Sequence, residues 1–297
     1  MKVFITGGTG FIGAALCELL AEHHHQVTVL TRDTAAARKR LGPAIKLVSS
    51  PQAVSDDGYD VVVNLAGLPI ADRRWSDARK AALHKSRIDL TNQLVDALEG
   101  MKDKPKVLLS ASAIGYYGDQ GEHWVDEDTA PRAEYTHQLC EAWEQAALRA
   151  QNIGVRVCVL RIGLVVGAGG GFLARMLPPF KVGLGGRLGS GRQWMSWVHR
   201  QDVLRMLCYL MEHETLQGPF NGTAPRPVRN AEFSQILGRQ LHRPAKVPVP
   251  SAALQLAMGE MSGLLLTGQR VAPSRLLEAG FEFHYEQLEA ALSEALS

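Results

Sequence analysis

The chain has 297 residues, 46% of them hydrophobic and 21% charged, and a formal net charge of +2 at pH 7, which is typical of a globular protein of one large domain or two smaller ones. The near-neutral charge and the lack of a basic block exclude nucleic acid and acidic membrane surfaces as general partners. No apolar run approaches the roughly 18 residues of a membrane-spanning helix and no leader segment precedes the first strand, so we expect no membrane partner.

The N-terminus predicts a strand, a glycine-rich turn and the start of a helix. Gly7 allows a sharp turn out of the strand, Gly10 lets the backbone approach a pyrophosphate, and Gly13 lets the helix pack against the strand. The helix N-terminus offers free N–H groups and a partial positive charge to phosphates. The segment therefore predicts a dinucleotide site, with Gly7, Thr9, Gly10, Phe11, Ile12 and Gly13 as cofactor-binding residues.

The spacing of these glycines indicates which class of dinucleotide site to expect. G-x-x-G-x-x-G differs from the G-x-G-x-x-G of ordinary dehydrogenases. With the sequence T-G-G-T-G-F-I-G over 6–13, it resembles the extended, epimerase-type branch of the short-chain dehydrogenase/reductase superfamily.

The first predicted helix runs into three adjacent histidines, His23, His24 and His25. Adjacent residues on a helix do not face one way, so we expect a surface turn here and no metal site. The four cysteines have no C-x-x-C spacing and stand in apolar settings, so we expect reduced core thiols of a cytoplasmic protein. They are Cys17, Cys140, Cys158 and Cys208.

The end of the second predicted strand, Thr31-Arg32-Asp33, bears on the choice of cofactor. An enzyme that prefers NAD places an acidic side chain here, which accepts hydrogen bonds from the ribose hydroxyls. Here Thr31 holds the first position and Arg32 follows, and a guanidinium suits a 2′-phosphate. Arg38 and Lys39 are further candidates for the same phosphate, whereas Asp33, rotated inward, would hold a ribose instead. The pattern favours NADP(H), with Arg32 as its phosphate ligand.

Strand and helix patterns then alternate, with strands predicted at 46–48, 61–64, 107–110 and 155–160. This alternation predicts an α/β fold, a Rossmann-type doubly wound parallel sheet with right-handed crossovers and a smaller C-terminal substrate lobe. The glycine-rich stretch from 167 to 191 predicts a loop that leaves the nucleotide domain and returns to it. We expect a Rossmann domain over 1–166, which about 195–225 rejoins, and a substrate lobe with a helical cap over 167–297.

The segment Asn64-Leu65-Ala66-Gly67 follows the fourth strand, at the carboxyl edge where such sheets bind ligands. In the superfamily that the chain resembles, a similar N-x-A-G contributes backbone contacts to the cofactor ribose and steadies the sheet. The resemblance implies that Asn64, Leu65, Ala66 and Gly67 bind the cofactor.

The catalytic segment departs from the superfamily pattern, which has a Ser or Thr after the fifth strand and Tyr-x-x-x-Lys on the next helix. Ser112 takes the hydroxyl position. Aligned on Glu144, the tyrosine falls at Thr136 and the lysine at Cys140, and the helix contains no lysine. The usual proton relay is missing, because neither residue places a positive charge beside a tyrosine.

Other side chains near Ser112 are candidates for the acid. Tyr116 is the first, and the prediction of catalytic residues is Ser112 with Tyr116. Tyr117, and the pair His137 and Glu141, remain open, and packing beneath the substrate loop is an equal expectation for both tyrosines.

The segment from 189 to 199 bears on the substrate. In nucleotide-sugar epimerases a similar segment carries an arginine that grips the substrate diphosphate, and here that position is Met195. Arg187 and Arg192 are not at the matching place. Trp194 and Trp197 favour a flatter, less charged ligand, so a nucleotide sugar is not the expected substrate.

The tail narrows the resemblance to one group. Its motifs at 248–250, 258–261, 268–271 and 277–283 resemble the C-terminal domain of the atypical, YfcH-like "epimerase family proteins". The resemblance implies NADP(H) binding and an oxidoreductase or epimerase acting on an unidentified small molecule. The alternative is a catalytically silent NADP(H)-binding sensor that signals through a partner. The sequence leaves the substrate, the direction of reaction and the oligomeric state open.

Overall fold

Seven parallel strands form the central sheet of the computed structural model, which describes residues 1–55 and 58–297. The strand order is β11-β7-β5-β4-β1-β2-β3, which confirms the expected Rossmann-type doubly wound sheet. The order reverses between β1 and β4, where such sheets bind ligands at the carboxyl ends of the strands. The strands are β1 (Lys2–Thr6), β2 (Gln26–Leu30), β3 (Lys46–Val48), β4 (Val61–Asn64), β5 (Val107–Ala113), β7 (Arg156–Ile162) and β11 (Gly218–Gly222).

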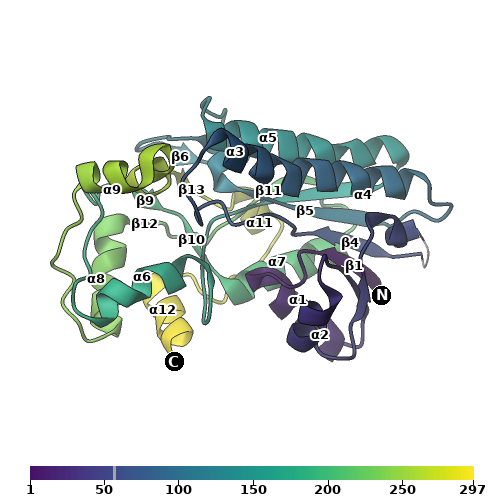
Figure 1. Ribbon diagram of the computed structural model, residues 1–297, viewed down its shortest axis with the longest axis horizontal. Helices are drawn as coiled ribbons and strands as arrows, with labels where there is room; N and C mark the ends of the chain where they lie inside the picture. Colours follow the sequence, from purple (N-terminus) through teal and green to yellow (C-terminus); the bar gives the residue numbers. More distant parts are fainter. Residues whose placement is uncertain (56–57) are drawn as a thin grey trace.

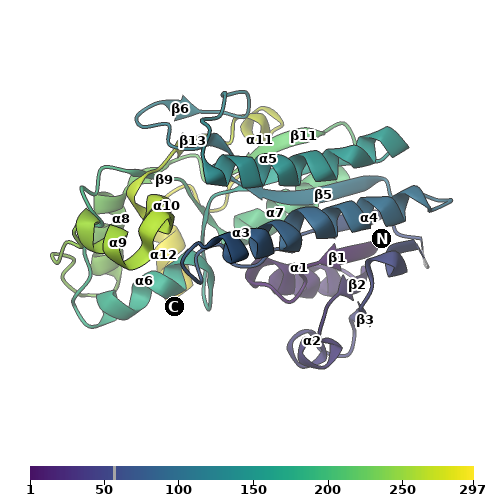
Figure 2. The same cartoon turned by 45° about the horizontal axis from the view of Figure 1, so that its top comes forward.

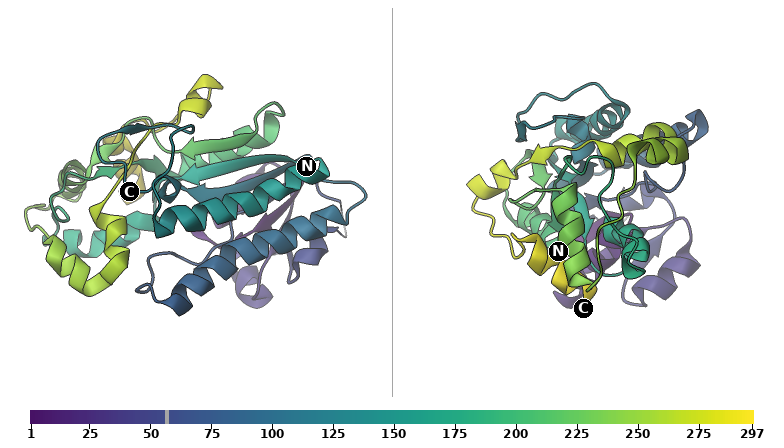
Figure 3. Two further views of the ribbon diagram at one scale, coloured as in Figure 1. Left: turned by 90° about the horizontal axis from the view of Figure 1, so that it is seen from above. Right: turned by 90° about the vertical axis from the view of Figure 1, so that its left-hand side faces the viewer.

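Helices cover both faces of this sheet (Figure 1). Alternate strand residues face opposite ways, so Phe4 and Leu108 join the core under one helical layer and Ile5 and Leu109 join the other. Figure 3 shows α4 and α5 side by side along the sheet. One layer contains α3 (Asp77–His84), the π-helical turn Lys85–Asp89, α4 (Leu90–Glu99) and α5 (Tyr135–Leu148), and the other contains α1 (Phe11–Glu22), α2 (Thr34–Leu41) and α7 (Arg200–Glu212).

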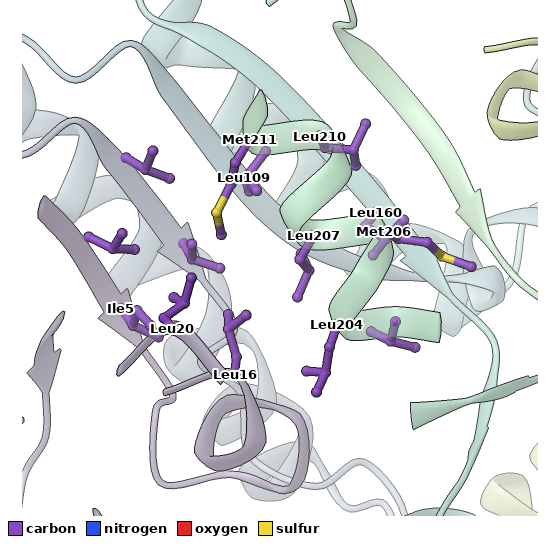
Figure 4. Close-up of a cluster of buried hydrophobic side chains, with 14 of the residues drawn as sticks. Ile5, Leu16, Leu20, Leu109, Leu160, Leu204, Met206, Leu207, Leu210 and Met211 are labelled. Atoms are coloured by element: carbon purple, nitrogen blue, oxygen red, sulfur yellow. The ribbon is translucent and has the colours of Figure 1, made fainter. Parts of the chain in front are cut away.

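The helix α7, from the segment that follows residue 195, packs against the Rossmann unit. Leu204 and Leu207 of α7 face Leu16 and Leu20 of α1 across the cluster in Figure 4, and all lie over sheet residues such as Leu160. The strand β11 then adds to the sheet beside β7.

A second lobe stands at one end of the sheet (Figures 1 and 2). Its core gathers Phe180, Trp197, Phe233 and Leu292 from four separate segments. The lobe contains α6 (Gly171–Lys181), α8 (Asn230–Gln240), α9 (Ser251–Met258), α10 (Gly263–Leu266), α12 (Leu288–Leu296) and the strand pairs β8 (Leu164–Val166) with β10 (Trp197–His199) and β9 (Trp194–Met195) with β12 (Val228–Arg229).

The remaining elements tie the C-terminal region back to the Rossmann unit. The strand β13 (Arg270–Val271) pairs with β6 (Trp124–Val125), and Leu276 and Phe281, which follow β13 in the chain, enter the core beneath α7. The residues after 167 therefore do not form one separate body. These elements are β6 (Trp124–Val125), β13 (Arg270–Val271), α11 (Ser274–Glu278) and the 3₁₀ turns Pro51–Ser55, Ile114–Tyr117, Arg149–Ile153 and Gly259–Ser262.

The prediction of a loop throughout 167–191 is wrong, because α6 occupies Gly171–Lys181 and contains Pro178 and Pro179. Leu173, Met176 and Phe180 are buried on one face of this helix. Their burial outweighs the two missing N–H donors, and both prolines lie near the C-terminal end of the helix. In the part of the chain that the structure describes, no helix has the length and apolar character needed to cross a membrane.

Candidate functional site

Glycine is required by packing at two of the three positions of the phosphate loop. Gly7 has φ +71°, and a Cβ on it would lie 2.6 Å from the carbonyl carbon of Leu65. A Cβ on Gly13 would lie 2.2 Å from the Gly7 carbonyl oxygen. Gly10 differs, because its added Cβ would meet only that oxygen, at 3.1 Å. Gly10 is the N-cap of α1 and no side chain caps this helix, so its first-turn N–H groups are left for a ligand.

A cavity of about 400 Å³ lies at this loop. The structure places Thr9, Arg32, Asn64 and Ala66 outside its lining. The predicted cofactor residues that line it are Gly7, Gly10, Phe11, Ile12, Gly13, Leu65 and Gly67.

Phe11 connects this cavity to the second lobe. A Cβ on Gly170 would lie 2.4 Å from the Phe11 ring, and one on Gly171 would lie 2.8 Å from it. The Arg200 Cζ lies 4.8 Å from the ring centroid, and Arg200 donates to the Ala168 carbonyl at 3.2 Å. The loop before α6 is therefore seated directly on the first turn of α1.

The Asn64 side chain steadies the sheet. It accepts from Thr6 Oγ1 at 2.7 Å and donates to Thr91 Oγ1 at 2.8 Å and Ser110 Oγ at 3.2 Å. The Ala66 N–H donates to Thr6 Oγ1 at 3.2 Å. These bonds join β1, β4, β5 and α4 just beneath the switch point, and they hold the loop that follows β4.

Of the candidates for the 2′-phosphate beyond β2, Arg32 is exposed and makes no side-chain hydrogen bond or ion pair with the described residues. Asp33 does not turn inward, because its carboxylate caps α2 by accepting from the Ala36 N–H at 2.9 Å. Arg38 clamps the turn after α2 and does not reach toward a ligand. Its Nη1 donates to the carbonyl oxygens of Gly42, Pro43 and Ile45, at 2.8, 3.0 and 2.8 Å.

A larger cavity, of about 580 Å³, lies between the Rossmann unit and the second lobe. Ala113 contributes from the end of β5, Gly115 from the 3₁₀ turn that follows it, Cys140 from α5, and Trp194 and Met195 from β9. The two cavities share part of their walls, so they adjoin. The shared residues are Ile162, Gly163, Leu164 and Phe172.

Ser112 does not line the larger cavity. Its side chain is 3% exposed, and Oγ donates to Glu144 Oε1 at 2.6 Å. Arg161 binds the same carboxylate through Nε and Nη2, both at 2.9 Å. Because β5 extends through Ala113, the alternation of side chains turns Ser112 toward this buried ion pair, and Ala113 lines the cavity.

The two tyrosines after β5 have different surroundings. Tyr116 is half-buried, its ring centroid lies 3.5 Å from Arg161 Cζ, and it does not line the larger cavity. Tyr117 is fully buried, donates to Asn221 Oδ1 at 2.7 Å and accepts from Arg161 at 2.9 Å. Burial raises the pKa of Tyr117 to about 12. Tyr117 is thus a packing residue, and the hydroxyl of Tyr116 is the freer of the two.

Thr136 and Cys140 both line the larger cavity. Burial, with the charge of Glu144 added, raises the pKa of the Cys140 thiol to about 11, so it is neutral at pH 7. His137 Nε2 lies 3.5 Å from Glu141 Oε2, and neither residue lines the cavity. No lysine or arginine stands where the expected pair would be.

The structure shows a cluster of side chains around Tyr135 that no sequence pattern indicated. Lys80 Nζ lies 4.5 Å from the Tyr135 ring centroid, and the Trp75 ring meets Tyr135 edge-on with centroids 4.7 Å apart. Lys80 also binds Glu260 at 2.7 Å. Burial raises the pKa of Tyr135, and the charge of Lys80 opposes that shift. Tyr135 and Glu260 are far from Trp75 and Lys80 in the sequence, and no local pattern links them.

The sheet order and the glycine loop at its switch point define a nucleotide-binding Rossmann protein of the short-chain dehydrogenase/reductase class. The model of the NAD dependent epimerase/dehydratase family matches residues 3–221, and the chain belongs to this family. A second model, a domain of unknown function (DUF1731), matches residues 249–295. The family predicted from the sequence is thereby confirmed.

Relatives match over almost the whole chain. An epimerase family protein of Mycobacterium bovis is 43% identical, over 99% of this chain and 97% of its own length. The chloroplastic SDR39U1 homolog of Arabidopsis thaliana is 41% identical, over 98% of this chain and 86% of its own length. The crystal structure of human epimerase family protein SDR39U1 with NADPH is 36% identical, covers 99% of both chains and has a TM-score of 0.90. A UDP-glucuronic acid 4-epimerase from Bacillus cereus shares the fold, with a TM-score of 0.82 at 18% identity over 99% of this chain and 98% of its own.

Proposed function

We propose that this chain binds NADP(H) at the phosphate loop and acts as an oxidoreductase or epimerase on a small molecule in the larger cavity. The observation that carries the proposal is the shared wall of the two cavities. A dinucleotide whose pyrophosphate lies at the N-terminus of α1 can extend past this wall into the larger cavity. The human relative crystallised with NADPH supports this cofactor. When bound, NADP(H) supplies or accepts a hydride there.

In this proposal the chain's own residues bind and orient the cofactor. The first-turn N–H groups of α1 hold the pyrophosphate, Gly10 leaves room for it, and Arg32 pairs with the 2′-phosphate. Thr9 and the segment 64–67 are proposed to contact the rest of the cofactor, with Asn64 holding that segment in place. We also propose a reducing, cytoplasmic location, which the four free cysteines support.

The choice of cofactor gives the first prediction. NADPH is expected to bind at least tenfold more tightly than NADH, about 1.4 kcal/mol, because only NADPH has the phosphate that pairs with Arg32. Arg32→Ala should remove most of this difference. Calorimetric titration of both variants with both cofactors measures it. Arg40→Ala, which removes another exposed arginine nearby on α2, is the matched control and should keep the preference. Equal affinities in the parent protein would refute the NADP(H) assignment.

The catalytic residues remain Ser112, proposed to orient the substrate, and Tyr116, proposed as the acid. The Ser112 hydroxyl is held by Glu144, so it orients a substrate only if that bond is exchanged. Tyr116 reaches the cavity only if its side chain turns from its place over Arg161.

A second prediction concerns catalysis. Thr136→Tyr combined with Cys140→Lys is expected to gain weak carbonyl-reductase activity with NADPH on a panel of aldehydes and ketones. The parent and either single variant should show essentially none, because a tyrosine needs the lysine to be a usable acid and the lysine alone has no proton relay to serve. Both positions line the cavity, so the new side chains have space. Oxidation of NADPH, followed by its absorbance, is the measurement.

The outcomes of this experiment bear on both candidate functions, the enzyme and the sensor. Robust turnover of the panel by the parent would contradict the prediction and would direct attention to Tyr116. Activity in the double variant alone would show that the cavity accepts cofactor and carbonyl and that only the acid is missing. That result is expected for an enzyme whose own substrate is not in the panel and also for the second candidate, a silent NADP(H)-binding sensor, which the neutral Thr136 and Cys140 support.

A further inference from the structure

The larger cavity is lined without any cation. Among the described residues that form its wall there is no lysine, arginine or histidine, and two acidic residues, Glu134 and Glu260, are present. A phosphate or carboxylate that leaves water needs charged donors to replace its hydration. A ligand anion in this cavity would find none in the wall and would lie near two carboxylates.

Two of the cations just outside the wall form ion pairs. Lys80 donates to both oxygens of Glu260, at 2.7 and 2.9 Å. Arg229 binds Glu122 at 2.7 Å. Arg270 forms no ion pair with the described residues, but it does not line the cavity: its Cζ lies 4.4 Å from the Trp194 ring centroid, in a cation–π contact, and its Nε is buried without a partner. At Met195, where the resemblance places the diphosphate-gripping arginine of nucleotide-sugar epimerases, the side chain is apolar and 4% exposed.

Polar side chains of the wall hold the second lobe together. Ser196 Oγ donates to the Gln269 carbonyl at 2.7 Å and accepts from the Val271 N–H at 2.9 Å. Thr267 Oγ1 donates to the Gly263 carbonyl at 2.8 Å. These two hydroxyls have no proton left to donate to a ligand, and much of the remaining surface consists of rings and aliphatic chains. Those are chiefly Trp75, Tyr135, Phe172, Trp194, Leu264 and Leu265.

Two wall residues still carry buried polar atoms with no partner in the described structure, Tyr135 Oη and Gln193 Oε1. Gln193 Nε2 faces two carbonyls, those of Leu188 at 3.1 Å and Leu265 at 2.7 Å. Both neighbours are acceptors, so the nitrogen of the Gln193 amide must point toward them and the amide cannot be flipped. Its oxygen is then an acceptor without a hydrogen-bond donor. A ligand with a neutral N–H or O–H can satisfy such an atom.

We propose that the larger cavity selects a flat and largely apolar substrate that carries no negative charge and has neutral hydrogen-bonding groups, and that it rejects phosphorylated and carboxylated molecules, nucleotide sugars included. This proposal rests on the proposed function for the use of the cavity as the substrate site. What it adds to the proposed function is the charge and the shape of the ligand.

The test uses two fluorescent probes that share one ring system. N-phenyl-1-naphthylamine is uncharged and has one N–H, and 8-anilino-1-naphthalenesulfonate adds a sulfonate to it. The neutral probe should bind at least tenfold more tightly, and UDP at about 1 mM, a concentration that saturates sites of micromolar Kd, should not displace it. Leu264→Glu, which adds a carboxylate to the wall, should weaken the neutral probe at least tenfold, with circular dichroism confirming the fold.

Leu256→Glu is the matched control, because Leu256 is 83% exposed on neighbouring α9 and lies outside the cavity. It should leave the affinity of the neutral probe unchanged. The proposal is overturned if the sulfonate probe binds as tightly as the neutral one, if UDP competes, or if Leu256→Glu and not Leu264→Glu weakens binding. Titrations with and without NADPH separate the two claims, because absent NADPH binding refutes the proposed function and leaves the probe preference measurable.

Discussion

Gly10→Val is expected to weaken NADPH binding at least a hundredfold, about 2.8 kcal/mol, in a protein that still folds. Gly10 has φ −77° and ψ 179°, a conformation open to any residue, and its added Cβ would meet only the Gly7 oxygen, at 3.1 Å. The branched side chain then covers the N–H groups that the pyrophosphate needs. Calorimetric titration measures the loss, and circular dichroism checks the fold.

The choice of position makes this experiment interpretable. The same change at Gly13 would drive a Cβ to 2.2 Å from a carbonyl oxygen and would disturb the fold itself. Gly100→Val is the control, because Gly100 ends α4 with φ −74° and its added Cβ would meet nothing closer than 3.6 Å. It should keep full affinity. Unchanged NADPH binding in folded Gly10→Val would place the cofactor elsewhere.

Arg161→Met is expected to lower the free energy of unfolding by about 3–5 kcal/mol. Arg161 and Glu144 form an ion pair whose side chains are 4% and 6% exposed. The arginine also donates to Tyr117 at 2.9 Å and to the Glu127 carbonyl at 3.3 Å. Removing it leaves the Glu144 charge buried with only Ser112 as a donor, and such a charge is costly without its partner. Urea denaturation measures the change.

Two further variants define the cause. Arg149→Met breaks an exposed pair with Asp96, whose 2.7 Å distance is similar but whose side chains are 43% and 58% exposed, and should cost about 0–1 kcal/mol. Adding Glu144→Gln to Arg161→Met should recover part of the loss, because the orphaned charge is gone. A loss in Arg161→Met no greater than that in Arg149→Met would show that the buried pair contributes no more than an exposed one.

The Rossmann sheet could be predicted because its signals are local. The strand runs, the glycine turn and the leucines at helix spacing each report on a few neighbouring residues, and alternation of strand and helix then limits the topology. The resemblance, and not a local pattern, implies that the segment at Asn64 steadies the sheet, and the three side-chain hydrogen bonds of Asn64 do so.

The site was harder to predict because two of its features do not depend on local sequence patterns. One is the register of a strand, where a shift of one residue turns a side chain to the other face, and the other is contact between residues far apart in the sequence. Ser112 has the expected residue type, but the pleat of β5 turns it to Glu144 and presents Ala113 to the cavity. Tyr135 and Lys80 meet only because α3 packs near the start of α5. The helix α6 forms against its glycine and proline content because burial of one face outweighs propensity.

The seating of Gly170 on the Phe11 ring makes two distant positions interdependent. The backbone at Gly170 is extended, with φ −176°, so it tolerates any residue by itself. The restriction comes from the ring, because any Cβ there would enter it at 2.4 Å. A larger side chain at 170 therefore requires a smaller one at 11. The side chains that position 170 of the second lobe can accept are therefore limited by Phe11 in the first turn of α1.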